Sequence, residues 1–116
     1  MGFYQHDGLE AFEPWPGCLA KQVVGKELGA ASVTALEVII EPGSEIPLHI
    51  HPGHEEDILI VLGTATCVIG ETIQDLEAPA TMLVPKDIVH QVRNESNTPI
   101  KVIGIFPTVD VARRYV

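Results

Sequence analysis

The chain has 116 residues, of which 7 are basic and 16 are acidic, so its formal net charge at pH 7 is −9. This length fits one domain with a single hydrophobic core, and a hydrophobic share of 46% is typical of a globular protein. The acidic balance argues against binding to nucleic acid or to anionic membrane surfaces, because both need a basic surface. We therefore expect neither as a partner.

No segment predicts export or membrane insertion. The longest apolar run, residues 58–62, is far shorter than the roughly 20 residues needed to cross a bilayer. The first residues lack the basic and apolar regions of a signal peptide. Cys18 and Cys67 lie far apart in the sequence and form no C-x-x-C pair, so we expect free thiols in a reducing cytosol rather than a bridge. The lack of a targeting signal is the basis on which we expect a cytoplasmic protein.

Residues 1–17 differ from the rest because they hold four of the six aromatic side chains, together with two prolines. No apolar period of 2 or 3.6 residues is evident among them. Exposed aromatic side chains seek a partner surface, so we expect an N-terminal arm that packs on the domain or contacts a second subunit. On this basis the sequence predicts a homodimer, since the open edges of a small sheet also need cover.

Residues 18–116 form one predicted domain of short strands separated by turns. The runs are apolar or alternating, and they end at glycine, proline, asparagine or aspartate. The expected strands are 32–41, 57–62, 64–69, 81–84, 89–94 and 100–106. Only residues 110–115 have a pattern that predicts a helix, of about one and a half turns. Many short strands at short spacing predict an all-β sandwich or barrel.

Three of the five histidines lie within six positions of the chain. His49 and His51 form H-x-H, and residues i and i+2 of a strand point to the same face. Glu56 reaches that face only if the chain turns in between, which the dipeptide Pro52-Gly53 predicts. H-x-H alone is more often a pair of surface or core histidines, whereas H-x-H followed by a carboxylate and a strand favours a metal site.

The strand after Glu56 predicts an apolar wall beside that site. Ile58, Ile60 and Leu62 share the parity of Glu56 and are expected on the same face. His90 follows a turn and opens another strand. A lone histidine there is more often structural, but in a chain that already has this H-x-H pattern it indicates a third imidazole ligand.

Residues 43–94 resemble the two sequence motifs of the cupin superfamily. Five residues match the first motif at every spacing: Gly43, His49, His51, Glu56 and Gly63. Three residues match the second motif: Pro85, His90 and Asn94. Asp87 and Pro79 depart from it, since both stand where the family usually has glycine. Both are turn positions, and aspartate tolerates turn geometry, so neither departure affects a ligand.

The resemblance implies an all-β fold, a single cupin-type double-stranded β-helix (jelly-roll) barrel of two antiparallel sheets over residues 18–116. It also implies one divalent metal per chain. The implied metal ligands are His49, His51, Glu56 and His90. Of the two adjacent acids, Glu56 and not Glu55 has the family's spacing to Gly63. The family pattern gives His54 no ligand role, and we expect none for His6.

Three imidazoles and a carboxylate suit Fe, Mn, Ni, Co or Zn, and leave about two positions open on a six-coordinate ion. The lack of a thiolate argues against a closed structural zinc site. Few basic residues remain to face inward, and Arg93 has outward parity relative to His90. A phosphosugar needs cationic clamps, so we expect instead a small neutral or mono-anionic substrate of the enol, diketone or phenolic type.

Three kinds of function agree with these observations. We expect first a metal-dependent oxygenase of the dioxygenase type, because open positions on a metal beside an apolar wall can hold substrate together with dioxygen. The alternative is a non-oxidative metalloenzyme, an isomerase, cyclase, decarboxylase or lyase, with His54 or Glu55 as candidate catalytic acid–base groups. The third is a ligand- or metal-binding cupin without catalysis.

Overall fold

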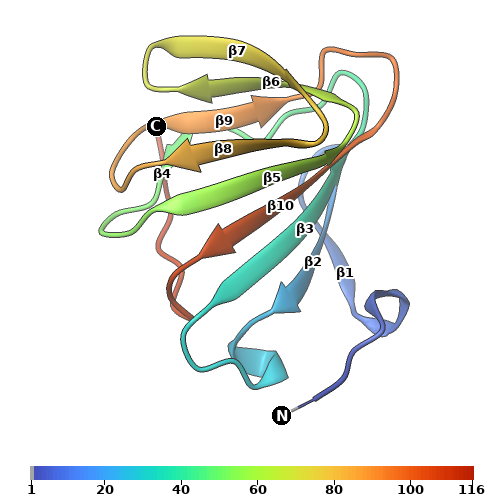
Figure 1. Ribbon diagram of the computed structural model, residues 1–116, viewed down its shortest axis with the longest axis vertical. Coiled ribbons are helices and arrows are strands. Elements are labelled where there is room, and N and C mark those ends of the chain that lie inside the picture. The colour runs from blue at the N-terminus through green and yellow to red at the C-terminus, as the bar shows by residue number, and fades with distance from the viewer. Residues whose placement is uncertain (1) are drawn as a thin grey trace.

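The computed structural model describes residues 2–116 and consists of two antiparallel sheets (Figure 1). The strands are β1 (Ala11–Trp15), β2 (Cys18–Val24), β3 (Thr34–Ile40), β4 (His49–Ile50), β5 (Glu56–Leu62), β6 (Thr64–Ile69), β7 (Thr72–Glu77), β8 (Ala80–Val84), β9 (His90–Arg93), β10 (Ile100–Phe106) and β11 (Arg114–Tyr115). Two short 3-10 helices, η1 (His6–Gly8) and η2 (Lys26–Leu28), complete the elements. The strand order is β1-β2-β3-β10-β5-β8 in one sheet and β11-β4-β9-β6-β7 in the other.

The core lies between the two sheets because each inner strand buries alternate side chains. β10 pairs with β3 over its full length, and every second residue of β10 is buried. Ile40, Ile60 and Ile100 are among the largest fully buried side chains. This alternation gives each sheet one apolar face, and the two faces pack together as in a sandwich. The predicted all-β barrel of two antiparallel sheets is therefore confirmed.

Most predicted strands agree with the structure to within two residues. Residues 64–69 and 100–106 are strands with the expected bounds. The helix expected over 110–115 is wrong, because residues 114–115 form β11 and pair with β4 instead. The sequence analysis did not single out β1, β2, β4, β7 or β11. β4 and β11 have two residues each, β1 and β7 are mostly exposed, and β2 is defined by its pairing with both β1 and β3.

The expected N-terminal arm contributes directly to the larger sheet. β1 lies within residues 1–17 and pairs with β2. Trp15, the last residue of β1, belongs to the buried core cluster. Phe3, Tyr4 and Phe12 are exposed, so the contact of this arm with a second subunit stays a prediction.

Two loops at one end of the barrel are tied together by a turn residue. Asp87 has a φ of +64°, in the left-handed region that an aspartate adopts more readily than most residues. Its Oδ1 accepts a hydrogen bond from the backbone N–H of Gly53 at 2.9 Å. This bond joins the turn that follows His51 to the turn that precedes His90, so it fixes the relative position of the two segments.

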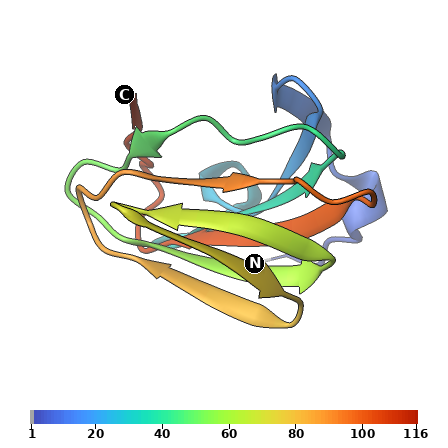
Figure 2. The ribbon, with the colours of Figure 1, turned by 90° about the horizontal axis from the view of Figure 1, so that it is seen from above.

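The C-terminal segment, residues 107–116, returns across the same end of the barrel. Figure 2 shows the C-terminus beside β4, and the register pairs Arg114 with Ile50 and Tyr115 with His49. The segment thereby covers the side of β4 that β9 leaves open. Over residues 2–116 there is no helix with the length and apolar character needed to cross a membrane.

Candidate metal centre

Four buried side chains from three parts of the chain meet at this end of the barrel. They form what we call the metal cluster: His49, His51, Glu56 and His90. One potential ligand atom from each lies within 4.8 Å of the other three. β4 carries the first residue, the turn after it the second, and β5 and β9 begin with the other two. The structure thus brings together the four residues predicted from the sequence as metal ligands.

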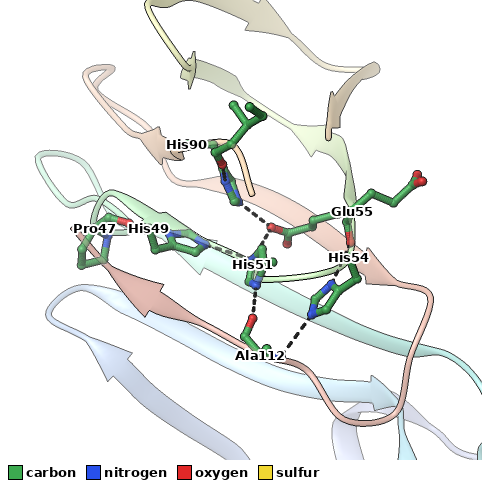
Figure 3. A network of polar contacts seen from close by, with 9 residues as sticks. Pro47, His49, His51, His54, Glu55, His90 and Ala112 are labelled. Carbon is green, nitrogen blue, oxygen red and sulfur yellow. Dashed lines mark hydrogen bonds and ion pairs between the residues drawn. The ribbon is translucent and has the colours of Figure 1, made fainter. Parts of the chain in front are cut away.

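The contacts within the cluster are short (Figure 3). The Nε2 atom of His49 lies 3.2 Å from the Nε2 atom of His51. Oε1 of Glu56 lies 3.0 Å from Nε2 of His51 and 2.9 Å from Nε2 of His90. The ring centroids of His49 and His90 are 4.2 Å apart. All three imidazoles therefore turn the same ring nitrogen toward one point.

The opposite ring nitrogen of each imidazole is held by the backbone. Nδ1 of His49 lies 2.7 Å from the carbonyl oxygen of Pro47, and Nδ1 of His51 lies 2.7 Å from that of Ala112. Nδ1 of His90 lies 3.0 Å from the carbonyl oxygen of Ile88. A carbonyl oxygen only accepts, so each Nδ1 must donate. Each ring then turns its Nε2 atom toward the centre, the orientation found in metal-binding histidines.

This arrangement of ligand atoms suits a cation at its centre. When the imidazoles are neutral, the three Nε2 lone pairs and the carboxylate are all hydrogen-bond acceptors, and at about 3 Å they repel one another unless a positive charge lies among them. A proton on an imidazole can supply that charge, and so can a metal ion. Nitrogen and oxygen donors of this kind suit Fe, Mn, Ni, Co or Zn. The residues present therefore fit a divalent transition metal.

Burial and close contacts shift the pKa values in the direction that metal binding needs. Burial lowers the pKa of His49 to about 4, so its imidazole is neutral at physiological pH. Burial raises the pKa of Glu56, but the contacts with His51 and His90 outweigh that effect and lower it to about 2. Glu56 is thus a carboxylate and His49 a neutral imidazole, the forms that bind metals.

Gly104 on β10 leaves room for the carboxylate of Glu56, and the sequence analysis did not identify it. A Cβ atom added at Gly104 would collide with Oε2 of Glu56 and would lie 3.4 Å from its carboxyl carbon. The signal was available, because Gly104 interrupts an apolar strand, and such a glycine often marks a close approach by another group.

A small apolar cavity adjoins the metal cluster. Its free space is about 20 Å³, and its walls include Ile58 and Phe106 beside the cluster residues. The expected apolar wall holds for Ile58, which lines the cavity, whereas Ile60 is buried in the core and is not one of the lining residues. It is wrong for Leu62, which is 57% exposed because the pairing of β5 with β10 shifts register next to it.

Of two arginines near the site, one lies outside the cavity as expected and the other lines it. The guanidinium of Arg93 pairs with the carboxylate of Glu95 at 3.4 Å, away from the cavity, in agreement with its predicted parity. Arg113 lines the cavity, which the sequence analysis did not anticipate. A helix was expected over this segment, so no strand parity was available to place the side chain.

The two candidate acid–base residues lie beside the cluster and not within it. The ring of His54 stacks on that of His51 at a centroid distance of 5.2 Å, and its Nε2 accepts the backbone N–H of Ala112 at 3.0 Å. The side chain of Glu55 points away from the cluster (Figure 3). Both residues line a separate surface groove. Their catalytic role stays a prediction.

Solved structures of similar fold include two enzymes. The polyketide cyclase RemF from Streptomyces resistomycificus matches with a TM-score of 0.85 and 16% identity, over 100% of this chain and 85% of that one. A mutant of oxalate decarboxylase OxdC from Bacillus subtilis matches with a TM-score of 0.85 and 21% identity, over 97% of this chain and 31% of that one. At these identities the likeness shows the fold.

Curated relatives match at 26–27% identity. "Alginate biosynthesis protein AlgA" of Pseudomonas putida is 26% identical over 97 residues, which are 84% of this chain and 19% of that protein. "Protein SchB" of Streptomyces halstedii is 27% identical over 75 residues, which are 65% of this chain and 54% of that protein. The chain thus spans about a fifth of the first relative and about half of the second.

The family model described as "Cupin domain" matches residues 36–106. The match runs from β3 to the end of β10 and contains all four residues of the metal cluster. Because it covers more than half of the chain, the protein belongs to the cupin family.

Proposed function

We propose that this protein is a cupin metalloenzyme that binds one divalent transition metal through the metal cluster and catalyses a non-oxidative reaction of a small organic molecule. The observation that carries the proposal is the convergence of the Nε2 atoms of three buried imidazoles and one buried carboxylate beside an apolar cavity. The reaction class comprises isomerisation, cyclisation, decarboxylation and elimination.

The comparisons support the non-oxidative alternative better than the oxygenase that we expected first. RemF, a polyketide cyclase, has the same fold over the whole of this chain. The other solved structures of similar fold include oxalate decarboxylases from two bacteria. The oxygenase stays a second candidate, since dioxygen can also reach open positions on a metal of this ligand type.

A bound metal would supply a Lewis acid that polarises a carbonyl or enol oxygen of the substrate. The protein's own residues orient the ligands and exclude water from the cavity. The backbone bonds to the Nδ1 atoms hold the three imidazoles in one tautomer and orientation. Ile58, Val102 and Phe106 form an apolar wall that excludes water and receives the carbon skeleton of the substrate.

Elemental analysis of the purified protein tests the metal site. We expect about one divalent transition-metal ion per chain, and its loss in His51→Ala, because this change removes a ligand atom and a partner of Glu56. The matched control is His6→Ala, since His6 lies on η1 and is exposed. If His51→Ala retains the metal content of the unchanged protein, the site assignment is wrong.

Turnover with and without oxygen tests the reaction class. A panel of enolisable ketones, diketones and phenolic compounds is offered to the metal-loaded protein in air and under anaerobic conditions. We expect conversion at the same rate in both, with His51→Ala inactive. Conversion that stops without oxygen and consumes oxygen in air would instead support the oxygenase.

We also propose the cytoplasm as the compartment. Cys18 and Cys67 are both buried free thiols, which supports the expected reducing environment.

A further inference from the structure

Arg113 lies in the wall of the cavity beside the metal cluster. Among the residues that the structure describes, it is the only lysine or arginine in that wall. Its guanidinium carbon lies 5.5 Å from the centre of the Trp15 ring, within the range of a cation–π contact. Arg113 and Trp15 therefore lie together at one end of the cavity, and His49 and His90 line it as well.

The backbone on either side of Arg113 is held in place. Ala112 accepts a bond from His51 Nδ1 through its carbonyl oxygen and donates its N–H to His54 Nε2. On the other side, the Tyr115 hydroxyl accepts the indole N–H of Trp15 at 3.0 Å. These contacts hold Arg113 over the cavity even though residues 107–113 belong to no strand.

The guanidinium of Arg113 lacks an acidic partner. Its Nε is buried and has no hydrogen-bond partner, and no carboxylate of residues 2–116 lies within 4.0 Å of its nitrogen atoms. Other cations of this acidic chain do have partners, for example Lys26 with Asp110 at 2.9 Å and Lys101 with Glu37 at 3.5 Å. A buried donor without an acceptor is unfavourable, so such a group in a cavity wall indicates a place for an external acceptor.

We propose that Arg113 binds the anionic group of the substrate, a carboxylate, and so selects mono-anionic substrates with an apolar body. The planar guanidinium matches a carboxylate with two parallel N–H donors. The apolar walls then receive the rest of the molecule between Arg113 and the metal cluster. This inference rests on the proposed function and narrows its substrate class, which the sequence left as neutral or mono-anionic.

Binding must also displace part of the cavity wall. The free space of about 20 Å³ holds about one water molecule, and a substrate is larger. The backbone beside Arg113 is held, but its side chain is only half-buried, so the side chain can move when the anion is bound. Trp15 is the only tryptophan of the chain and lies under the guanidinium, so its fluorescence reports on this movement.

The test is a fluorescence titration of the Zn(II)-loaded protein with benzoate, and with benzamide as the neutral molecule of the same shape. Zn(II) is suitable because it fits the ligand set and has no redox chemistry. We expect benzoate to change the Trp15 emission in a saturable way. Arg113→Gln should weaken benzoate binding roughly tenfold or more, the effect of one lost charge-assisted pair. Arg113→Lys should weaken it less, because the charge remains without the planar fork.

The matched control is Arg114→Gln, which changes the net charge equally at an exposed neighbouring position. We expect benzoate affinity unchanged in Arg114→Gln, and benzamide affinity, if measurable, equal in all variants. The inference is overturned if Arg113→Gln binds benzoate as well as the unchanged protein, if Arg114→Gln loses as much affinity, or if benzoate leaves the Trp15 emission unchanged.

The zinc content of each variant separates this inference from the proposed function. If the unchanged protein holds no zinc, the proposed metal centre fails. If every variant holds one zinc ion and benzoate affinity does not depend on Arg113, only the inference about Arg113 fails. Retained zinc in Arg113→Gln also shows that the variant is folded at the site.

Discussion

The carboxylate of Glu56 depends on the absence of a side chain at Gly104. β10 runs beside β5, and the space next to Gly104 is filled by the carboxylate oxygen Oε2 of Glu56. That carboxylate lies 2.9 Å from Nε2 of His90 and 3.0 Å from Nε2 of His51. A Cβ atom at Gly104 would therefore displace the carboxylate that contacts the two imidazoles.

We predict that Gly104→Ala weakens metal binding about 10- to 100-fold, the usual effect of disturbing the support of a ligand. Competition of Zn(II) between the protein and a chromophoric chelator measures the affinity. Gly8→Ala is the control, because a Cβ atom at Gly8 meets nothing within 4 Å. Unchanged affinity in Gly104→Ala would show that Glu56 does not ligate the metal, or that it reaches the metal from another position.

At the scale of elements, the N-terminal arm and β1 form one edge of the larger sheet, and β8 forms the other. Phe3 is 99% exposed and Phe12 is 47% exposed, so the arm presents aromatic side chains to solvent. Exposed aromatic groups beside a free sheet edge are typical of a subunit contact. The edge at β1 is therefore where we expect a second copy of the chain.

We predict that the protein sediments as a dimer and that the double substitution Phe3→Ser, Phe12→Ser shifts it toward monomer. Removal of the whole arm is a poorer test, because it would also remove Trp15 from the core. Leu83→Ser is the control, since Leu83 is 67% exposed on the opposite edge strand, β8. A monomeric unchanged protein, or a double variant that stays dimeric, would contradict this account of the arm.

The sequence predicted six strands whose pattern reflects burial, and it missed β2 and the strands that depend mainly on pairing. β6 and β10 are apolar strands bounded by glycine or proline, so their bounds were predictable. β7 has almost no buried side chain, and its pairing with β6 defines it. β4 and β11 have two residues each and pair across about 65 positions of sequence, which no local pattern reveals.

The candidate site shows the same division. The four cluster residues were predictable because the spacing of two motifs carries them. Gly104, Ala112 and Arg113 were not, because their roles arise where β10 and the C-terminal segment approach the cluster. A wrong helix prediction for residues 110–115 also removed the basis for placing the backbone of Ala112 and the side chain of Arg113.

For the whole molecule, stability should fall in alkaline solution partly because of the cysteines. Burial raises the pKa of Cys18 to about 11, and does the same for Cys67. In the unfolded chain a thiol ionises near its ordinary pKa of 9. Between about pH 9 and pH 11 the unfolded chain thus loses protons that the folded protein keeps, so the free energy of unfolding contributed by these thiols is full below pH 9 and declines above it.

We predict that the free energy of unfolding of the unchanged protein decreases more between pH 8 and pH 10 than that of a Cys18→Ala, Cys67→Ala double variant. Urea unfolding at both pH values, followed by fluorescence, gives the two differences. The comparison cancels lysine and tyrosine ionisation, which both proteins share. Equal decreases would mean that the buried thiols do not contribute to the pH dependence.

The bond between His51 and Ala112 connects the metal cluster to a part of the chain 61 residues away. A metal ion that holds His51 in position therefore also stabilises the segment whose carbonyl oxygen accepts this bond. Thermodynamic linkage is reciprocal, so ordering of the segment strengthens metal binding by the same factor. Loss of the metal would then increase backbone amide exchange at Ala112, far along the chain from every ligand.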